Sequence, residues 1–217
     1  MSRFLPRHWF RKPPPAAFDA TLPSGLTLQL AFVRPEHAPR FTAGYEQLSD
    51  HSRRMRFFGQ VSSLSSKQLE FLTRPDGKNH IAYAALNLAD PQQPGVGVAR
   101  AIRLDADSQI AEVALTVLDA YQHQGAGLVL HAAVHVHAAA VGLEQFLYDV
   151  SPENHRFIEH LTALGAVKVS QDKDIVRLRL PVFGKPEQIS AKTPAALRLA
   201  AMIRQVREAS PTRAPVA

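Results

Sequence analysis

Apolar and polar residues alternate along several short stretches of the chain, which is the spacing that predicts strands. Strands predicted in this way cover residues 26–33, 81–88, 96–104, 110–118 and 146–150. The second and third are joined by a loop at residues 89–95, and the third and fourth by a short turn at 105–108, so we expect an antiparallel meander. Two further strands, at 167–170 and 175–180, are expected to form a closing hairpin.

Helices are predicted where serine, proline or glycine marks the end of a segment with helical spacing. The predicted helices cover residues 35–47, 49–58, 65–73, 125–141 and 151–165. In the last of these we expect Ser151 to be the N-cap and Pro152 to occupy the first helical position. After Pro181 the pattern weakens, but apolar residues at helical spacing follow Thr193-Pro194. This final helix is expected to pack on its own domain rather than on a partner.

Composition divides the chain into three parts. Residues 1–23 are rich in proline and basic residues, and we expect a loose or surface-bound arm. Residues 24–182 contain the strands and most of the helices and are expected to form one domain. Residues 183–217 form a C-terminal extension with one predicted helix.

The overall composition is that of an ordinary globular protein, with 46% hydrophobic and 20% charged residues among 217. We expect neither a membrane span nor a signal peptide. The chain has no cysteine, which excludes disulfides, thiolate catalysis and cysteine-ligated zinc, and we expect a cytoplasmic protein. Its net charge of +6 favours acidic ligands such as nucleotides, coenzymes or nucleic acid.

The turn between the strand at 110–118 and the helix at 125–141 carries the most informative motif. It reads Gln122-x-x-Gly125-x-Gly127. The first turn of a helix offers free N–H groups and the positive end of the helix dipole, and glycine lets the backbone approach a ligand closely. The turn therefore predicts a diphosphate site, to which Gln122 and Gln124 add polar side chains. Such a turn can also serve helix packing alone.

Two other nucleotide motifs do not fit this turn. No Lys-Ser or Lys-Thr follows it, as a P-loop would require. Position 122 is not glycine, and the turn lies outside an early parallel strand-helix-strand unit, so a dinucleotide fingerprint is excluded as well.

Residues 25–181 resemble a GNAT-type (Gcn5-related) N-acetyltransferase. Residues 111–128 are similar to the acetyl-CoA motif of that family, including its Gln/Arg-x-x-Gly-x-Gly/Ala element. Residues 151–167 are similar to its second motif, with Asn154 at the asparagine position and Leu164-Gly165 at the helix end. Within the superfamily, residues 48–59 and Ser65-x-x-Gln68-Leu69 resemble the acetyltransferase domain of bacterial protein lysine acetyltransferases.

The resemblance implies an α/β fold with a mixed, mostly antiparallel central sheet flanked by helices. The strands at 110–118 and 146–150 are expected to run parallel and to splay apart, with acetyl-CoA in the gap. Asn154 is expected either to approach the pantetheine arm or to bond to its own helix. The residues expected to bind the cofactor are Val117, Gln122, His123, Gln124, Gly125, Ala126, Gly127, Leu128 and Asn154.

Glu112 is the candidate general base. It lies in an otherwise apolar strand, on the same face as Ala114 and Thr116. Apolar neighbours disfavour a carboxylate anion, which would suit a base that takes a proton from an amine near neutral pH. In the lysine acetyltransferases that the chain resembles, the glutamate at this position is the proposed base. The alternative is a glutamate at a solvent-facing strand end.

The general acid of many GNAT enzymes has no counterpart at its usual position. The family places a tyrosine four residues before the glycine of the second motif, and this chain has Leu161 there. Tyr121 and Tyr148 are near in sequence, but neither matches that position. Either water protonates the leaving thiolate, or this subgroup uses no positioned acid.

Histidines and arginines allow further interpretations. His131 and His135 lie four residues apart on a predicted helix, a spacing compatible with a metal, but no acidic residue on that helix completes a site. We expect no metal and a packed or exposed polar stripe. Arg53, Arg54 and Arg56 either recognise an acidic acceptor or form a solvated surface.

Together these observations predict an acetyl-CoA-dependent N-acetyltransferase that acts on a primary amine, with a protein lysine as the favoured acceptor. Without cysteine no cysteinyl acyl-enzyme can form, so the amine is expected to attack the thioester directly. The alternatives are a small-molecule amine acetyltransferase and a non-catalytic acyl-CoA-binding module. Neither nucleic acid nor a membrane is the expected partner, and the sequence does not indicate an oligomeric state.

Overall fold

The computed structural model describes residues 16–22, 24–57, 63–90 and 95–209. Its centre is an eight-stranded sheet in the order β1-β2-β3-β4-β5-β6-β8-β7. Neighbouring strands are antiparallel except for β5 and β6, which run parallel. The strands are β1 (Phe18–Thr21), β2 (Thr27–Phe32), β3 (His80–Leu86), β4 (Gly97–Arg103), β5 (Ile110–Val117), β6 (Gln145–Val150), β7 (Val167–Gln171) and β8 (Val176–Pro181). The predicted α/β fold class is confirmed.

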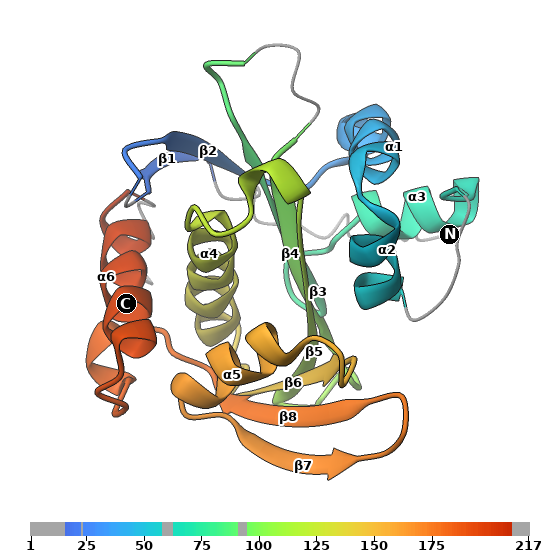
Figure 1. The fold of residues 1–217 in the computed structure, drawn as a ribbon. Coiled ribbons are helices and arrows are strands. Elements are labelled where there is room, and N and C mark those ends of the chain that lie inside the picture. Colours follow the sequence, from blue (N-terminus) through green and yellow to red (C-terminus); the bar gives the residue numbers. More distant parts are fainter. Residues whose placement is uncertain (1–15, 23, 58–62, 91–94, 210–217) are drawn as a thin grey trace, which may run out of the picture.

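Helices cover both faces of the sheet. Figure 1 shows α1, α2 and α3 on one face and α4 with α6 on the other, while α5 lies at the β6–β8 end and contacts α6 and β8. The helices are α1 (Ala38–Gln47), α2 (Asp50–Phe57), α3 (Ser66–Thr73), α4 (Ala126–Ala140), α5 (His155–Ala163) and α6 (Pro194–Ala209), with short 3-10 turns at η1 (Pro35–His37), η2 (Asp119–Tyr121) and η3 (Pro186–Gln188). No helix in the described ranges is both long enough and apolar enough to cross a membrane.

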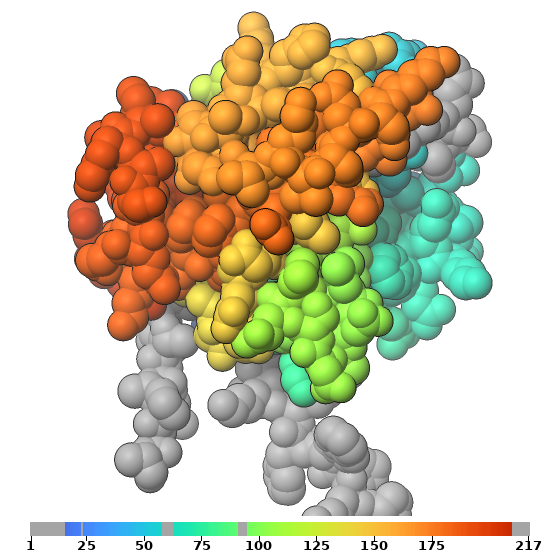
Figure 2. All heavy atoms as spheres, turned by 90° about the horizontal axis from the view of Figure 1, so that it is seen from below, coloured from blue at the N-terminus to red at the C-terminus, as the bar shows by residue number. Residues whose placement is uncertain are grey.

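The core lies mainly between the sheet and α4. Ten of the fifteen residues of α4 are buried, because the helix is enclosed by strands on one side and by α6 on the other. This position explains why α4 is apolar around most of its circumference. On α6, Leu199, Ile203 and Val206 are buried, so the prediction that this helix packs on its own domain is confirmed. Figure 2, which views the molecule from below Figure 1, shows the β7–β8 hairpin on the surface between α6 and α3.

Two predicted boundaries are wrong. Part of the expected loose arm is strand β1, in which Phe18 and Ala20 are buried and which pairs with β2. Four residues beside a proline-rich stretch are too few to show a strand period, so only pairing with β2 reveals it. Residues 1–15 of the arm lie outside the described residues, and the division into arm, domain and extension stays a prediction.

The second error concerns the start of α5. Ser151 was expected to be its N-cap, but the helix begins at His155 with Asn154 as N-cap. The Ser151 side chain instead accepts a hydrogen bond from the Glu153 N–H at 3.3 Å, and its carbonyl accepts one from the Asn154 N–H at 2.9 Å. These bonds form a turn before the helix and move its start toward the C-terminus.

Several histidines are buried within the fold. The His131 Nε2 lies 2.6 Å from the Tyr148 hydroxyl, and the His135 Nδ1 accepts a hydrogen bond from the Phe183 N–H at 3.0 Å. Burial lowers the pKa of His131 to about 3. Burial, together with the charge of Arg100, lowers the pKa of His80 to about 4. These residues are therefore neutral in the folded chain at pH 7.

We expect the free energy of unfolding to decrease as the pH falls from about 6.5 towards 4, because the unfolded chain then takes up protons that the folded chain excludes. Each such histidine contributes up to about 1.4 kcal/mol per pH unit. Urea denaturation at pH 7, 6 and 5 measures this slope. Replacing His80 by Gln should reduce it, whereas His51→Gln, at an exposed position, should not. A free energy of unfolding that is constant over this range would contradict the expectation.

Candidate functional site

The parallel strands β5 and β6 separate in the middle of the sheet. They pair at Ile110–Gln145, Ala111–Phe146 and Glu112–Leu147, and the ladder ends there. Strand β5 nevertheless continues to Val117 and β6 to Val150. The predicted splayed pair is therefore confirmed. Beyond Glu112, the edge of β5 that faces β6 has no strand partner among the described residues.

The glycine turn lies where β5 ends and α4 begins. Gly125 is the N-cap of α4 with a φ of 100°, and His123 has a φ of 62°, so both lie in the left-handed region. Within the described part of the chain, the backbone N–H groups of residues 123–127 form no hydrogen bond. Donors without a partner at the positive end of a fifteen-residue helix are an arrangement that can bind an anion.

The two glutamine side chains of the turn are already engaged. The Gln122 side-chain amide donates to the Val117 carbonyl at 3.1 Å and to the Ser52 hydroxyl at 3.3 Å. The Gln124 side-chain amide donates to the Ala120 carbonyl at 2.8 Å. They therefore shape the turn, and the backbone supplies the free donors. Of the other predicted cofactor residues, Ala126 is buried, and Val117, Gly127 and Leu128 are half-buried beside the turn.

A cation that the sequence analysis did not single out lies next to the turn. Arg156, in the first turn of α5, donates from Nη1 to the His123 Nε2 at 3.2 Å. The two residues lie 33 positions apart, and the side chain of His123 is exposed. A single arginine after Asn154 forms no recognisable motif, so only the packing of α5 against the turn reveals its position.

The second predicted motif makes structural contacts. The Asn154 Oδ1 accepts a hydrogen bond from the Phe157 N–H at 3.3 Å, so its side chain bonds to its own helix, as one of the two interpretations expected. Leu161 is fully buried and has no proton to donate. The hydroxyl of Tyr148 contacts His131, and burial raises the pKa of this tyrosine well above its usual value. Neither Leu161 nor Tyr148 is placed to act as a general acid.

Glu112 is the last β5 residue paired with β6. Its side chain is exposed, so the apolar surroundings expected for it are not provided by the chain alone. The strands diverge at this point, which leaves the carboxylate uncovered. On the sheet, Glu112 is paired with Ile102 of β4, and the next pair on the same face joins Ala114 to Arg100. That face carries α1, α2 and α3.

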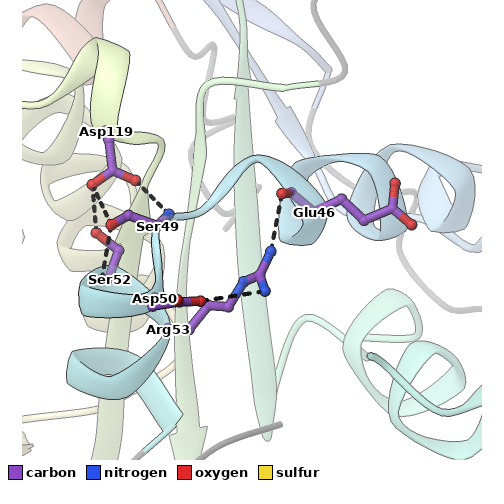
Figure 3. Close-up of polar contacts among 6 residues, drawn as sticks. All are labelled: Glu46, Ser49, Asp50, Ser52, Arg53 and Asp119. Carbon is purple, nitrogen blue, oxygen red and sulfur yellow. Dashed lines mark hydrogen bonds and ion pairs between the residues drawn. The ribbon is translucent and has the colours of Figure 1, made fainter. Parts of the chain in front are cut away.

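A hydrogen-bond network joins the start of α2 to Asp119, in the segment between β5 and the glycine turn (Figure 3). The carboxylate of Asp119 accepts bonds from the Ser49 N–H at 3.0 Å, the Ser49 hydroxyl at 2.9 Å and the Ser52 hydroxyl at 2.8 Å. Burial alone would raise the pKa of Asp119, but these bonds lower it below its ordinary value. Since Gln122 also donates to Ser52, the start of α2 is fixed to the segment that follows β5.

The predicted arginine cluster separates into different roles. Arg53 donates to the Glu46 carbonyl at 3.0 Å and lies 3.8 Å from an Asp50 carboxylate oxygen, so it braces α1 against α2. Arg54 is exposed, as the surface interpretation expected. Arg56 is half-buried and faces an apolar cavity instead.

Replacing Asp119 by Ala should lower the free energy of unfolding by about 1 kcal/mol, because it removes contacts of the kind that cap a helix N-terminus. Urea denaturation measures this loss, and Asp119→Asn should retain part of the stability because its side-chain oxygen can still accept. The control Asp107→Ala changes an exposed aspartate in the β4–β5 turn and should have little effect. Equal losses for Asp119→Ala and the control would argue against the network.

Comparisons with known proteins agree with this architecture. No family model matches the sequence. A curated relative, acetyltransferase Pat from Mycolicibacterium smegmatis, is 30% identical over 171 residues, which cover 77% of this chain and 50% of the relative. The chain thus spans about half the length of that relative.

Solved structures extend the likeness to three dimensions. The crystal structure of the GNAT domain of S. lividans PAT matches with a TM-score of 0.70 and 26% identity, over 82% of this chain and 99% of that domain. Ribosomal-protein-S5-alanine acetyltransferase from Vibrio fischeri matches with a TM-score of 0.62 at 12% identity, over 77% of this chain and 97% of that one, which shows the fold alone. The splayed strand pair and these likenesses show that the chain contains a GNAT-type domain, similar to the GNAT domain of S. lividans PAT.

Proposed function

We propose that the chain is an acetyl-CoA-dependent N-acetyltransferase that acts on a primary amine, with a protein lysine as the favoured acceptor. The observation that carries this proposal is the divergence of β5 and β6 immediately after Glu112, together with the turn of five free amides that follows the far end of β5. The similarity to acetyltransferase Pat supports the same activity.

The donor half of the site would hold acetyl-CoA, which supplies the acyl group as a thioester. The free N–H groups of residues 123–127 would bind the diphosphate, and the Arg156 guanidinium would add a positive charge beside them. The pantetheine arm would lie along the open edge of β5, whose last residues end at this turn. Asn154, at the start of α5, would border the arm from the β6 side.

The reaction would be a direct transfer. Glu112 would accept a proton from the acceptor ammonium, and the free amine nitrogen would attack the thioester carbonyl carbon. The new C–N bond would form as the C–S bond breaks, and the second proton of the amine nitrogen would pass through water to the CoA thiolate, since Leu161 cannot provide one. Binding of donor and acceptor over the exposed Glu112 would remove water from its carboxylate, which makes it a stronger base.

Replacing Glu112 by Gln should lower the rate of acetyl transfer by about 100-fold or more, the usual contribution of a general base. Release of free CoA with a lysine-containing protein as acceptor measures this rate. The variant should keep its affinity for CoA, because Glu112 is remote from the glycine turn. Glu208→Gln, an exposed change near the end of α6, is the matched control and should retain full activity.

Two results would overturn parts of the proposal. An unchanged rate for Glu112→Gln would exclude this residue as the base. A chain that acetyl-CoA stabilises thermally, but that transfers the acetyl group to neither proteins nor small amines, would instead be a non-catalytic acyl-CoA-binding module.

A further inference from the structure

An apolar cavity of about 100 Å³ lies between the sheet and α1, α2 and α3. Its walls include Phe41, Phe57 and Leu72, together with Ala114 and Thr116 of β5. The described residues that line it include no aspartate or glutamate. The charged side chains among them are Arg40, Arg56 and Arg100, and all three are positive.

Arg100 is the most deeply buried of these cations. It lies on β4, only 2% exposed, and its Nη1 lies 3.4 Å from the Leu72 carbonyl and 3.1 Å from the His80 Nε2. Its guanidinium carbon is 5.9 Å from the centre of the Phe41 ring. Among the described residues, Arg100 has no carboxylate within ion-pair distance. Burial, and then the charge of Arg56, lowers the pKa of Arg100 to about 9, so it is still charged at neutral pH.

Arg56 brings a second positive charge to the cavity from the last turn of α2. It too makes no ion pair with the described part of the chain, and its guanidinium carbon lies 5.0 Å from the Phe57 ring centre. Burial lowers the pKa of Arg56, and the charge of Glu112 partly offsets this effect. Arg56 therefore lies within electrostatic reach of both Arg100 and the candidate base.

The register of the sheet fixes how these groups are related. Arg100 pairs with Ala114, and Glu112 is the next β5 residue on the same face, about 7 Å along the strand. Guanidinium groups that are shielded from water without a carboxylate at ion-pair distance are costly, and each can bind a carboxylate through two parallel hydrogen bonds. An acceptor whose amine lies at Glu112 would place an attached carboxylate at these arginines.

We propose that Arg56 and Arg100 bind a carboxylate of the acceptor, so that the preferred substrate is an amine that carries a carboxylate a few bonds from its nitrogen. This inference rests on the proposed function. It narrows the acceptor from any primary amine to ω-amino acids and to lysines with an acidic neighbour.

Calorimetry with the full chain saturated with CoA tests carboxylate recognition without turnover, because it measures the affinity for an amine directly. 5-Aminopentanoate and pentylamine are matched in length and differ in the carboxylate. We expect the first to bind about tenfold or more tightly, the size of a hydrogen bond between charged groups. Arg56→Gln should abolish the difference, whereas Arg54→Gln, on the exposed side of the same helix, should preserve it. Arg56→Gln is the decisive variant, because Arg100 also contacts α3 and its loss can unfold the chain.

Transfer assays locate the carboxylate. With acetyl-CoA as donor, kcat/KM should be about tenfold higher for a peptide with Glu beside its lysine than for the same peptide with Gln, and Arg56→Gln should remove this preference.

Equal affinity for the two small amines would overturn the proposal. If Arg56→Gln instead changes the preference between succinyl-CoA and acetyl-CoA, the carboxylate belongs to the acyl group and the acceptor assignment is wrong. Carboxylate-dependent binding without any transfer would support carboxylate binding by Arg56 and Arg100, but it would overturn the proposed enzymatic function.

Discussion

The separation of β5 and β6 is the constraint on which the rest of the structure depends. Backbone groups in a sheet must be paired, so a parallel ladder that stops after Glu112–Leu147 requires another partner on the open edge. The two strands lead to different helices, β5 to α4 and β6 to α5, and the Arg156–His123 contact links the start of α5 to the turn before α4. The free amides of α4 and the Arg156 side chain of α5 therefore lie next to the same opening.

The two sides of the opening are mechanically joined. Asp119 and Gln122, which follow β5, form hydrogen bonds with Ser49 and Ser52 at the start of α2. The helix that borders the apolar cavity is therefore fixed to the segment that contains the glycine turn. The last turn of α2 places Arg56 at the apolar cavity, which Arg100 of β4 also lines. Through this connection, the position of the proposed acceptor site at the cavity depends on the same segment that is proposed to bind acetyl-CoA.

Sequence patterns predicted what depends on local periodicity. The meander strands, α3 and the glycine turn were all predicted, because alternation, the serine cap and Gly-x-Gly act within a few neighbouring residues. Strand β1 was not, since its four residues acquire a structure only by pairing with β2. The start of α5 was misplaced because Ser151 forms a turn that competes with the capping role.

The candidate site was predictable on its donor side only. The expected surroundings of Glu112 were wrong because burial depends on where β6 leaves β5, which the sequence of β5 does not encode. Arg100 could have been noticed as a charge within an apolar strand, but its proximity to Arg56 follows from how α2 is anchored. Arg156 meets His123 across 33 residues of chain, a distance at which no local pattern operates.

Amide hydrogen exchange with and without CoA tests most directly whether the opening between β5 and β6 is the cofactor site. If the free N–H groups of residues 123–127 bind the diphosphate, saturating CoA should slow their exchange strongly, while the exchange of α6 on the far side should change little. Unchanged exchange at residues 123–127 in the presence of bound CoA would contradict this assignment of the site.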